Sequence, residues 1–366
     1  MKINIFKPAK IGSLELKNRI AMAPMTRARN KDGIPKQYNS QRTGAGLIIT
    51  EGTAISTTAS GVLHIPGLYT PAQVQGWKLV TEAVHAKGSK IFTQLWHVGR
   101  ISHVSNQPDG QAPVAPSNIQ ASNSSAWGYD ENGKEGFVTA SKPRALETKE
   151  VYQVVLDFAN AAKNAIEAGF DGVELHGANG YLIEQFLNPY VNNRTDRYGG
   201  SIENRSRFLL EAIDASIEAI GADKVGIRLT PYGGLHELPH YDEIEETYEY
   251  LAQELSKRKI AYIHIMDQKS RGSFAIPEGF LERFRAWYDG IIILAGGMDR
   301  EKSEKLINQG VIDIAGFGEP FISNPDLVER LENNWPLTEP KRELHYGLTM
   351  EGYLDWKTYK QENSLL

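Results

Sequence analysis

Three side chains that could hold and protonate a reacting group lie close together in the middle of the chain. His176, Asn179 and Tyr181 follow directly on a short apolar run at residues 172–175. An imidazole and a carboxamide can donate hydrogen bonds without carrying a charge, and a phenol can act as a general acid. Donors aimed at one oxygen stabilise the negative charge that develops on it. The three residues therefore predict a site that polarises a carbonyl or nitro group and then supplies a proton.

Eight apolar runs, each long enough for one strand, alternate with segments of helical periodicity. Parallel strands that are covered by helices appear in a sequence as continuous apolar runs of this kind. Eight strand–helix repeats predict a (β/α)8 TIM barrel, an α/β fold whose catalytic residues lie at the C-terminal ends of the strands. An open, doubly wound sheet is the alternative, but no glycine-rich nucleotide turn follows the first run. The expected strands are residues 19–23, 47–52, 90–97, 172–176, 224–230, 260–267, 290–296 and 312–318, and the expected helices include residues 74–86, 151–168, 202–220, 247–257 and 302–309.

Two segments interrupt this alternation. Residues 98–146 are rich in Ser, Asn, Gly and Pro and are too long for an ordinary connection, so we expect a lid insertion after the third strand. Residues 188–205 are dense in Asn, Arg, Asp and Gly, and we interpret their charges as salt bridges that fix a loop. The first residues predict a short hairpin that closes the base of the barrel. We expect residues 1–366 to form one domain.

The composition limits the classes of function. Cysteine is absent, which excludes disulfides, thiolate nucleophiles and cysteine-ligated metals, so any redox chemistry needs a bound cofactor. His236 and His240 share a polar loop, but no third ligand is evident and we expect no metal. A net charge of −5 without a basic stripe argues against nucleic acid, and no apolar segment predicts a membrane span. The N-terminus shows no apolar signal core, so we expect a cytoplasmic protein. We also expect a monomer or a homodimer.

Further polar side chains should reach the same mouth of the barrel. Gln94 and Trp96 share one face of their strand, and Arg228 lies inside an apolar strand, where a cation needs an anionic partner. Thr26 falls just past the first strand. These side chains and His176 are therefore expected to converge at the C-terminal ends of the strands.

Glycine turns end the last two expected strands. The seventh expected strand ends at Gly296, which Gly297 follows, and the eighth ends at Gly318, which Glu319 follows. Barrels commonly bind phosphate with backbone amides after these two strands, and glycine lets the chain approach closely. The turns predict a phosphate-bearing ligand that lies across the barrel mouth.

Ordered motifs along almost the whole chain resemble the old yellow enzyme family, the FMN-dependent ene-reductases. The motifs lie at residues 18–27, 47–53, 92–100, 170–182, 186–189, 193–205, 321–327, 346–347 and 351–353. The resemblance implies that FMN lies over the barrel mouth, with Thr26 at the flavin C4 carbonyl, Gln94 at the pyrimidine edge and Arg228 at the N1–C2 edge. It also implies roles in FMN binding for Pro24, Met25, Gly52, Gly296, Gly297, Gly318 and Glu319.

The resemblance also implies a reaction in two halves at one site. NADPH or NADH reduces FMN and leaves, and an activated alkene then binds with its carbonyl or nitro oxygen held by His176 and Asn179. Hydride passes from flavin N5 to the β-carbon and Tyr181 protonates the α-carbon. Trp96 and Tyr353 are expected to contact the substrate.

One residue departs from the family pattern. Most members carry Arg at the position of Glu319, where it clasps the FMN phosphate, so we expect weaker FMN binding unless this side chain points elsewhere. A degenerate barrel that binds flavin weakly is therefore one alternative, and a reductase of nitroesters or nitroaromatics at the same site is another. A metal-dependent aldolase or isomerase would need converging carboxylate and His ligands, which Glu51 alone does not supply.

Overall fold

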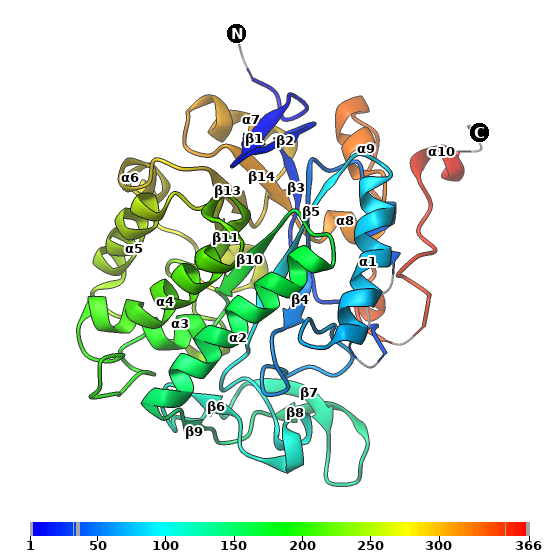
Figure 1. Cartoon of the computed structure of the whole chain (residues 1–366). Coiled ribbons are helices and arrows are strands. Elements are labelled where there is room, and N and C mark those ends of the chain that lie inside the picture. Colours follow the sequence, from blue (N-terminus) through cyan, green and yellow to red (C-terminus); the bar gives the residue numbers. More distant parts are fainter. Residues whose placement is uncertain (1–2, 32, 34–36, 348, 364–366) are drawn as a thin grey trace.

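The computed structural model describes residues 3–31, 33, 37–347 and 349–363, and its centre is a closed barrel of eight parallel strands. Neighbouring strands follow one another in chain order around the barrel, as Figure 1 shows. The (β/α)8 prediction is confirmed. The strands are β3 (Ile20–Met22), β4 (Leu47–Ala54), β5 (Lys90–Trp96), β10 (Gly172–Gly177), β11 (Val225–Leu229), β12 (Tyr262–Met266), β13 (Ile292–Ala295) and β14 (Ile314–Phe317).

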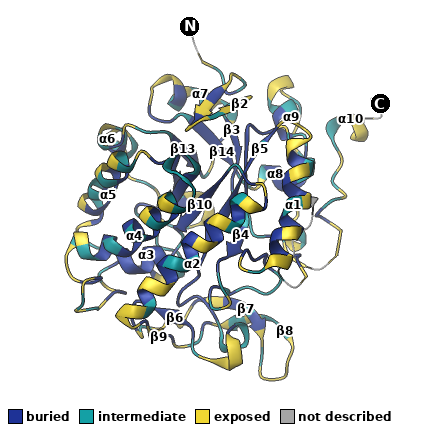
Figure 2. Ribbon diagram, in the orientation of Figure 1, coloured by how far each residue is buried: buried dark blue, intermediate teal, exposed yellow. Residues whose placement is uncertain are grey.

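Helices surround the barrel and bury one face against it. In α2 the buried residues include Val151, Val154, Val155 and Phe158, a spacing that gives one apolar stripe. Figure 2 shows the same alternation of buried and exposed positions along this helix. The predicted helices are confirmed as α1 (Pro71–His85), α2 (Thr148–Glu167), α4 (Ile202–Ile220), α5 (Ile244–Arg258) and α7 (Arg300–Asn308). Further helices are α3 (Leu182–Leu187), α6 (Phe280–Trp287), α8 (Pro320–Ser323), α9 (Leu327–Asn333) and α10 (Tyr359–Glu362).

The predicted N-terminal hairpin closes the base of the barrel. It consists of the antiparallel strands β1 (Ala9–Ile11) and β2 (Leu14–Leu16). Their apolar side chains share one cluster with Phe92 and Tyr262, which come from strands of the barrel. In Figure 1 this hairpin lies at the top, at the end of the barrel opposite to β7 and β8.

The expected lid insertion has secondary structure of its own. Within it β7 (Ser125–Tyr129) and β8 (Glu135–Thr139) form an antiparallel hairpin, and β6 (Val114–Ala115) pairs with β9 (Arg144–Ala145). Arg100 anchors the start of the insertion by donating hydrogen bonds to the carbonyls of His236 and Glu237. The Glu237 carboxylate in turn accepts hydrogen bonds from Asn123 and Ser124. The insertion therefore lies against the loop that follows β11, at the C-terminal end of the strands.

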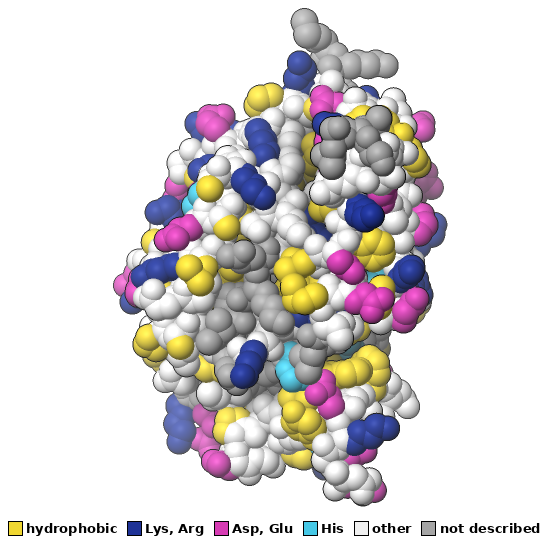
Figure 3. Space-filling model, turned by 90° about the vertical axis from the view of Figure 1, so that its right-hand side faces the viewer, with side chains coloured by type: hydrophobic (Ala, Val, Ile, Leu, Met, Phe, Trp, Pro, Cys, Tyr) yellow, Lys and Arg dark blue, Asp and Glu magenta, His cyan; other side chains and the backbone are white. Residues whose placement is uncertain are grey.

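The charged loop at residues 188–205 is held by ion pairs, as its composition predicts. Arg194 contacts Asp196 at 2.5 Å, and Arg205 contacts Glu243 at 3.0 Å. On the face drawn in Figure 3, Lys and Arg side chains are interspersed with Asp and Glu. Among the described helices, none is long and apolar enough to cross a membrane.

Candidate active site

Strand register brings the predicted polar side chains to the interior of the barrel in two levels. At the lower level, Glu174 of β10 lies opposite Gln94 of β5. At the upper level, His176 of β10 lies opposite Arg228 of β11. Because alternate residues of a strand point to the same side, Trp96 shares the face of Gln94. The upper level therefore carries the side chains that face the C-terminal mouth.

Aromatic rings close together form one wall of this mouth. The ring centroid of Tyr181 lies 4.9 Å from that of Trp96 and 5.1 Å from that of His176. The rings of Trp96 and His176 are 6.1 Å apart. His236, which follows β11 in the chain, places its ring 5.0 Å from Tyr181. The three predicted residues Trp96, His176 and Tyr181 are thus brought into contact.

Burial sets the protonation states of the two titratable groups at the mouth. Burial and the charge of Arg228 hold the pKa of His176 well below its ordinary value. Burial also raises the pKa of the Tyr181 phenol. Because the pKa shifts disfavour imidazolium and phenolate, both side chains are neutral near neutral pH. Two neutral groups that retain protons can donate hydrogen bonds or protons to a bound oxygen or carbon.

Asn179 is held by contacts to residues far away in the sequence. Its backbone has the left-handed φ of 57°, its N–H donates to Thr230 Oγ1 at 2.9 Å, and its carbonyl accepts from His236 Nδ1 at 2.7 Å. Its side-chain Oδ1 accepts from Gln268 Nε2 at 3.1 Å. Sequence reasoning did not find Thr230 or Gln268, and it considered His236 only as a metal ligand.

The floor of the site is a buried polar group around Glu174. Its carboxylate accepts a hydrogen bond from Gln94 Nε2 at 2.7 Å and contacts His264 Nδ1 at 2.8 Å. Glu174 and His264 were missed by sequence reasoning, although Glu174 shares the strand face of His176. Since Gln94 uses its NH2 group on Glu174, its carbonyl oxygen is left to accept a hydrogen bond from a ligand.

Arg228 is a buried cation that forms no ion pair with any residue that the structure describes. Its exposure is 5%, burial lowers its pKa to about 10, and no described residue accepts a hydrogen bond from its Nε. The anionic partner expected for this arginine is not a side chain of the described residues, and its assignment to the flavin stays a prediction. The carboxylate of Glu174 is occupied by Gln94 and His264, so it acts on Arg228 only through space.

The predicted residues after β3 and β14 lie next to each other. β3 and β14 are paired, and a Cβ at Gly318 would lie 3.7 Å from Met25 Sδ. Gly297 has a φ of +60° and open space where a Cβ would be, whereas a Cβ at Gly296 would lie 2.2 Å from the Asp267 carbonyl. The Glu319 carboxylate is about half exposed and lies 3.9 Å from His345 Nε2. The roles of these residues, and of Pro24 and Thr26, in FMN binding stay predictions.

Two predicted residues have surroundings that the sequence did not suggest. A Cβ at Gly52 would lie 2.4 Å from the Trp96 ring, so glycine is required here for the packing of that indole. Tyr353 is 1% exposed and stacks on Tyr38 with ring centroids 4.7 Å apart. Its cationic neighbours are Arg27 and Arg29, and no ring contact joins it to the described aromatic wall of the mouth. Its expected contact with substrate therefore gains no support from this geometry.

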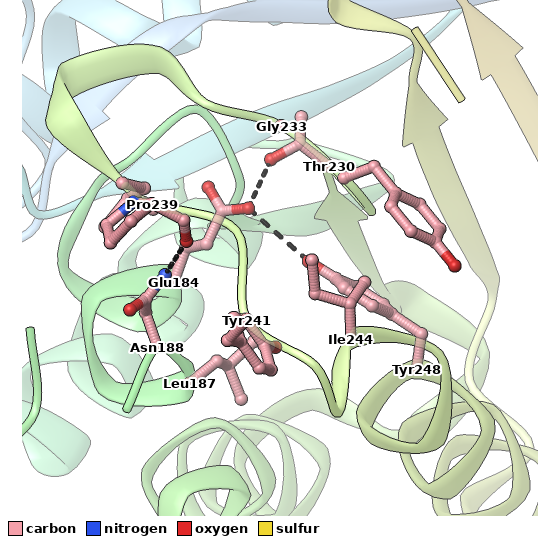
Figure 4. Close-up of a pocket in the computed structure, with 11 residues that line it drawn as sticks. Glu184, Leu187, Asn188, Thr230, Gly233, Pro239, Tyr241, Ile244 and Tyr248 are labelled. Atoms are coloured by element: carbon pink, nitrogen blue, oxygen red, sulfur yellow. Dashed lines mark hydrogen bonds between the residues drawn. The ribbon is translucent and has the colours of Figure 1, made fainter. Parts of the chain in front are cut away.

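A narrow cavity behind the Asn179 turn contains a buried carboxyl group. Glu184, in α3, accepts hydrogen bonds from Thr230 Oγ1 at 2.6 Å, from the Gly180 N–H at 2.6 Å and from Tyr248 at 3.4 Å. Figure 4 shows Glu184 pointing toward Thr230 and Tyr248. Burial raises the pKa of Glu184 to about 7. This group supports the turn through its hydrogen bonds to the Gly180 N–H and to Thr230, which in turn accepts from the Asn179 N–H.

The histidines considered as metal ligands are used in other ways. His236 contacts the Asn179 carbonyl, and His240 Nε2 contacts the carbonyl of Tyr232 at 2.8 Å. Among the residues that the structure describes, no group of three or more His, Asp or Glu side chains could hold a metal ion.

Comparisons with known proteins find a matching family model and similar chains of known structure. Residues 4–338 match the model of the NADH:flavin oxidoreductase / NADH oxidase family. The chain is 42% identical over 364 residues to 12-oxophytodienoate reductase 1 of Oryza sativa subsp. japonica, which covers 97% of this chain and 93% of the relative. It is similar to the solved structure of morphinone reductase, with a TM-score of 0.96, 46% identity and coverage of 99% and 98%. A structure of morphinone reductase in complex with tetrahydroNAD has a TM-score of 0.93, 47% identity and coverage of 97% and 98%.

Proposed function

Because the chain belongs to the old yellow enzyme family of FMN-dependent NADH:flavin oxidoreductases, we propose that it reduces activated C=C bonds with electrons from NADPH or NADH. The substrates are α,β-unsaturated carbonyl or nitro compounds. The observation that carries the proposal is that His176 and Tyr181, both neutral, are in ring contact at the mouth of the barrel. Asn179, in the turn between them, has its side chain fixed by a hydrogen bond from Gln268. The comparison with 12-oxophytodienoate reductase and with morphinone reductase bound to tetrahydroNAD supports the same class of reaction.

The described residues fit FMN. The unpaired Arg228 guanidinium suits the electron-rich N1–C2 edge of a flavin, and the free carbonyl oxygen of Gln94 suits the pyrimidine N–H. The open space at Gly297, next to Gly318 on the adjacent turn, suits a phosphate held by backbone amides. When bound, FMN supplies hydride transfer from the nicotinamide to the substrate.

The protein's own side chains then bind and protonate the substrate. His176 and Asn179 donate hydrogen bonds to the carbonyl or nitro oxygen, which draws electrons from the alkene and stabilises the charge that develops on that oxygen. Tyr181 gives its phenolic proton to the α-carbon and regains one from solvent. Trp96 packs against Tyr181 and forms part of the pocket wall. NAD(P)H and one proton are consumed for each alkene reduced.

These contacts favour a working enzyme over the degenerate barrel considered above. A buried cation without a partner is costly to keep, and a ligand with a negative or electron-rich edge offsets that cost. The test is an anaerobic titration of the purified protein. We expect flavin absorbance that bleaches with NADPH or NADH and returns on adding 2-cyclohexenone, with cyclohexanone as product. A protein that takes up no FMN, or whose reduced flavin does not react with the enone, would contradict the proposal.

A further inference from the structure

Gln268 is a buried amide that connects Asn179 to the loop after β11. It begins the 3₁₀ helix at Gln268–Arg271, directly after β12, and is 2% exposed. A Cβ at Gly233 would lie 2.8 Å from the Gln268 carboxamide, so the loop packs closely around it. The side chain is therefore fixed in a tight site beside the turn that carries Asn179.

Backbone donors determine which way the Gln268 amide faces. Its Oε1 accepts hydrogen bonds from the N–H of Gly234 at 3.0 Å and from that of Leu235 at 3.3 Å. A backbone N–H can only donate, so the end of Gln268 that faces the loop must be its oxygen. The NH2 group is then the end that faces Asn179, and it can only donate as well.

The same reasoning extends to Asn179. Because Gln268 offers a donor, the side-chain atom of Asn179 that meets it must be Oδ1, at 3.1 Å. The backbone N–H and carbonyl of Asn179 are held by Thr230 and His236. No described residue accepts a hydrogen bond from Asn179 Nδ2, so this NH2 group is left to donate to a ligand.

We propose that Gln268 is a positioning residue that fixes the Asn179 carboxamide with its NH2 group toward the substrate oxygen. The inference rests on the proposed function, because it assigns Asn179 to the binding of that oxygen. An amide turned by 180° would present an acceptor to a carbonyl or nitro oxygen, and attraction would become repulsion. Two backbone N–H groups therefore fix the orientation of the Gln268 amide. Gln268 in turn fixes the orientation of the Asn179 amide, and so determines which atom of Asn179 faces the substrate.

The substitution Gln268→Glu tests the orientation with little change in shape. An ionised carboxylate still accepts from Gly234 and Leu235 but cannot donate to Asn179, so the Asn179 amide should turn over. Gln268→Met removes all three of these side-chain hydrogen bonds and leaves the Asn179 amide free to take either orientation. Ser273→Ala is the matched control, since Ser273 Oγ accepts from the same Gly234 N–H at 3.2 Å but is not hydrogen-bonded to Asn179 in the described structure.

Two measurements separate orientation from packing. The first is the second-order rate of reoxidation of the pre-reduced protein by 2-cyclohexenone. Loss of one donor to a developing oxyanion costs about a hundredfold in other enzymes, and we expect a loss of about tenfold or more for Gln268→Glu near pH 8. The loss should be smaller for Gln268→Met, and the Ser273→Ala rate should stay within about twofold of that of the unmodified protein. The second is the Kd of cyclohexanone by calorimetry, which should rise in the same order without any turnover.

The pH profile identifies the cause. A protonated carboxyl regains a donor, so the Gln268→Glu defect relative to the unmodified protein should shrink as the pH falls. A Gln268→Glu defect that is absent, no larger than that of Gln268→Met, or independent of pH would overturn the role of Gln268. Failure of the unmodified protein to reduce the enone would instead overturn the proposed function.

Discussion

The rings of His176 and Tyr181 meet edge to face, with centroids 5.1 Å apart and planes at 74°. His176 is the last residue but one of strand β10 and Tyr181 is the N-cap of the short helix α3, so the turn between them sets the geometry. Burial lowers the pKa of the imidazole and raises that of the phenol. The two pKa values shift in opposite directions, but each shift keeps its group neutral. Both side chains therefore retain a hydrogen that they can donate.

Replacing Arg228 by Met should stabilise the FMN-free protein while weakening FMN binding. A buried charge that no described residue pairs costs folding free energy, and even the replacement of buried ion pairs by apolar residues is often stabilising, by about 1–4 kcal/mol. The same change removes the cation that we assign to the flavin N1–C2 edge. Thermal melting of the FMN-free protein and fluorescence titration with FMN measure the two effects.

Arg42→Met is the matched control for that experiment. Arg42 is also buried, but its guanidinium donates to the carbonyls of Phe321 and Ile322 at 2.7 and 2.8 Å. Its loss should therefore lower the melting temperature. If Arg228→Met destabilises the FMN-free protein as much as Arg42→Met does, Arg228 is a structural residue and not a cation kept for a ligand.

Replacing Glu319 by Arg should tighten FMN binding. Two like charges about 4 Å apart repel by about 4 kcal/mol at an effective dielectric constant near 20, and the half-exposed position of Glu319 screens most of this. Glu319→Gln removes the negative charge without adding a positive one, so its Kd should lie between those of the unmodified protein and Glu319→Arg. Equal dissociation constants in flavin fluorescence titrations of all three proteins would show that this side chain lies away from the phosphate.

Glu184 should make the stability of the protein fall as the pH rises. Its pKa is raised to about 7 from the ordinary value of 4.5, so between these values the folded state binds more protons than the unfolded state. Stability is then lost progressively from about pH 4.5 to about pH 7, by about 3 kcal/mol in total. Glu184→Gln should remove this slope.

Denaturant unfolding across that pH range measures the slope for each protein. Glu278→Gln, at an exposed position, is the matched control and should leave the slope as in the unmodified protein. Parallel stability curves for the Glu184→Gln variant and the unmodified protein would contradict the raised pKa. A flatter curve for the Glu184→Gln variant would support the raised pKa, even where the variant is less stable than the unmodified protein at every pH.

The fold was predictable because the order of apolar residues in the sequence reflects which positions are buried. β11 and β12 are covered on both faces, so every residue in them is buried and each appears as an apolar run. The bounds of α6 were not predicted because it is eight residues long, too short for an apolar repeat to stand out. The insertion after β5 was expected as a lid, but its two-residue strands β6 and β9 are below the length at which alternation can be seen.

The site was predictable where its residues are neighbours in sequence or share a strand face. His176 and Tyr181 belong to one segment, and strand alternation placed Gln94 and Arg228. The supports of Asn179 could not be predicted, since Gln268 lies 89 residues away in the sequence. The lack of a carboxylate partner for Arg228 among the described residues could not be predicted either, because the partners of Glu174 come from other strands of the barrel and only the register reveals them.

The proton transfer assigned to Tyr181 is tested most directly by a single turnover of the pre-reduced protein with 2-cyclohexenone, comparing the unmodified protein with Tyr181→Phe. Phenylalanine keeps the ring contacts to His176 and Trp96 and removes only the phenolic hydroxyl, which carries the proton. We expect bleaching of the flavin by NADPH at nearly the rate of the unmodified protein, and reoxidation by the enone slower by about a hundredfold or more. Reoxidation at the rate of the unmodified protein would show that another group or water protonates the substrate, and would contradict the central role given to this phenol.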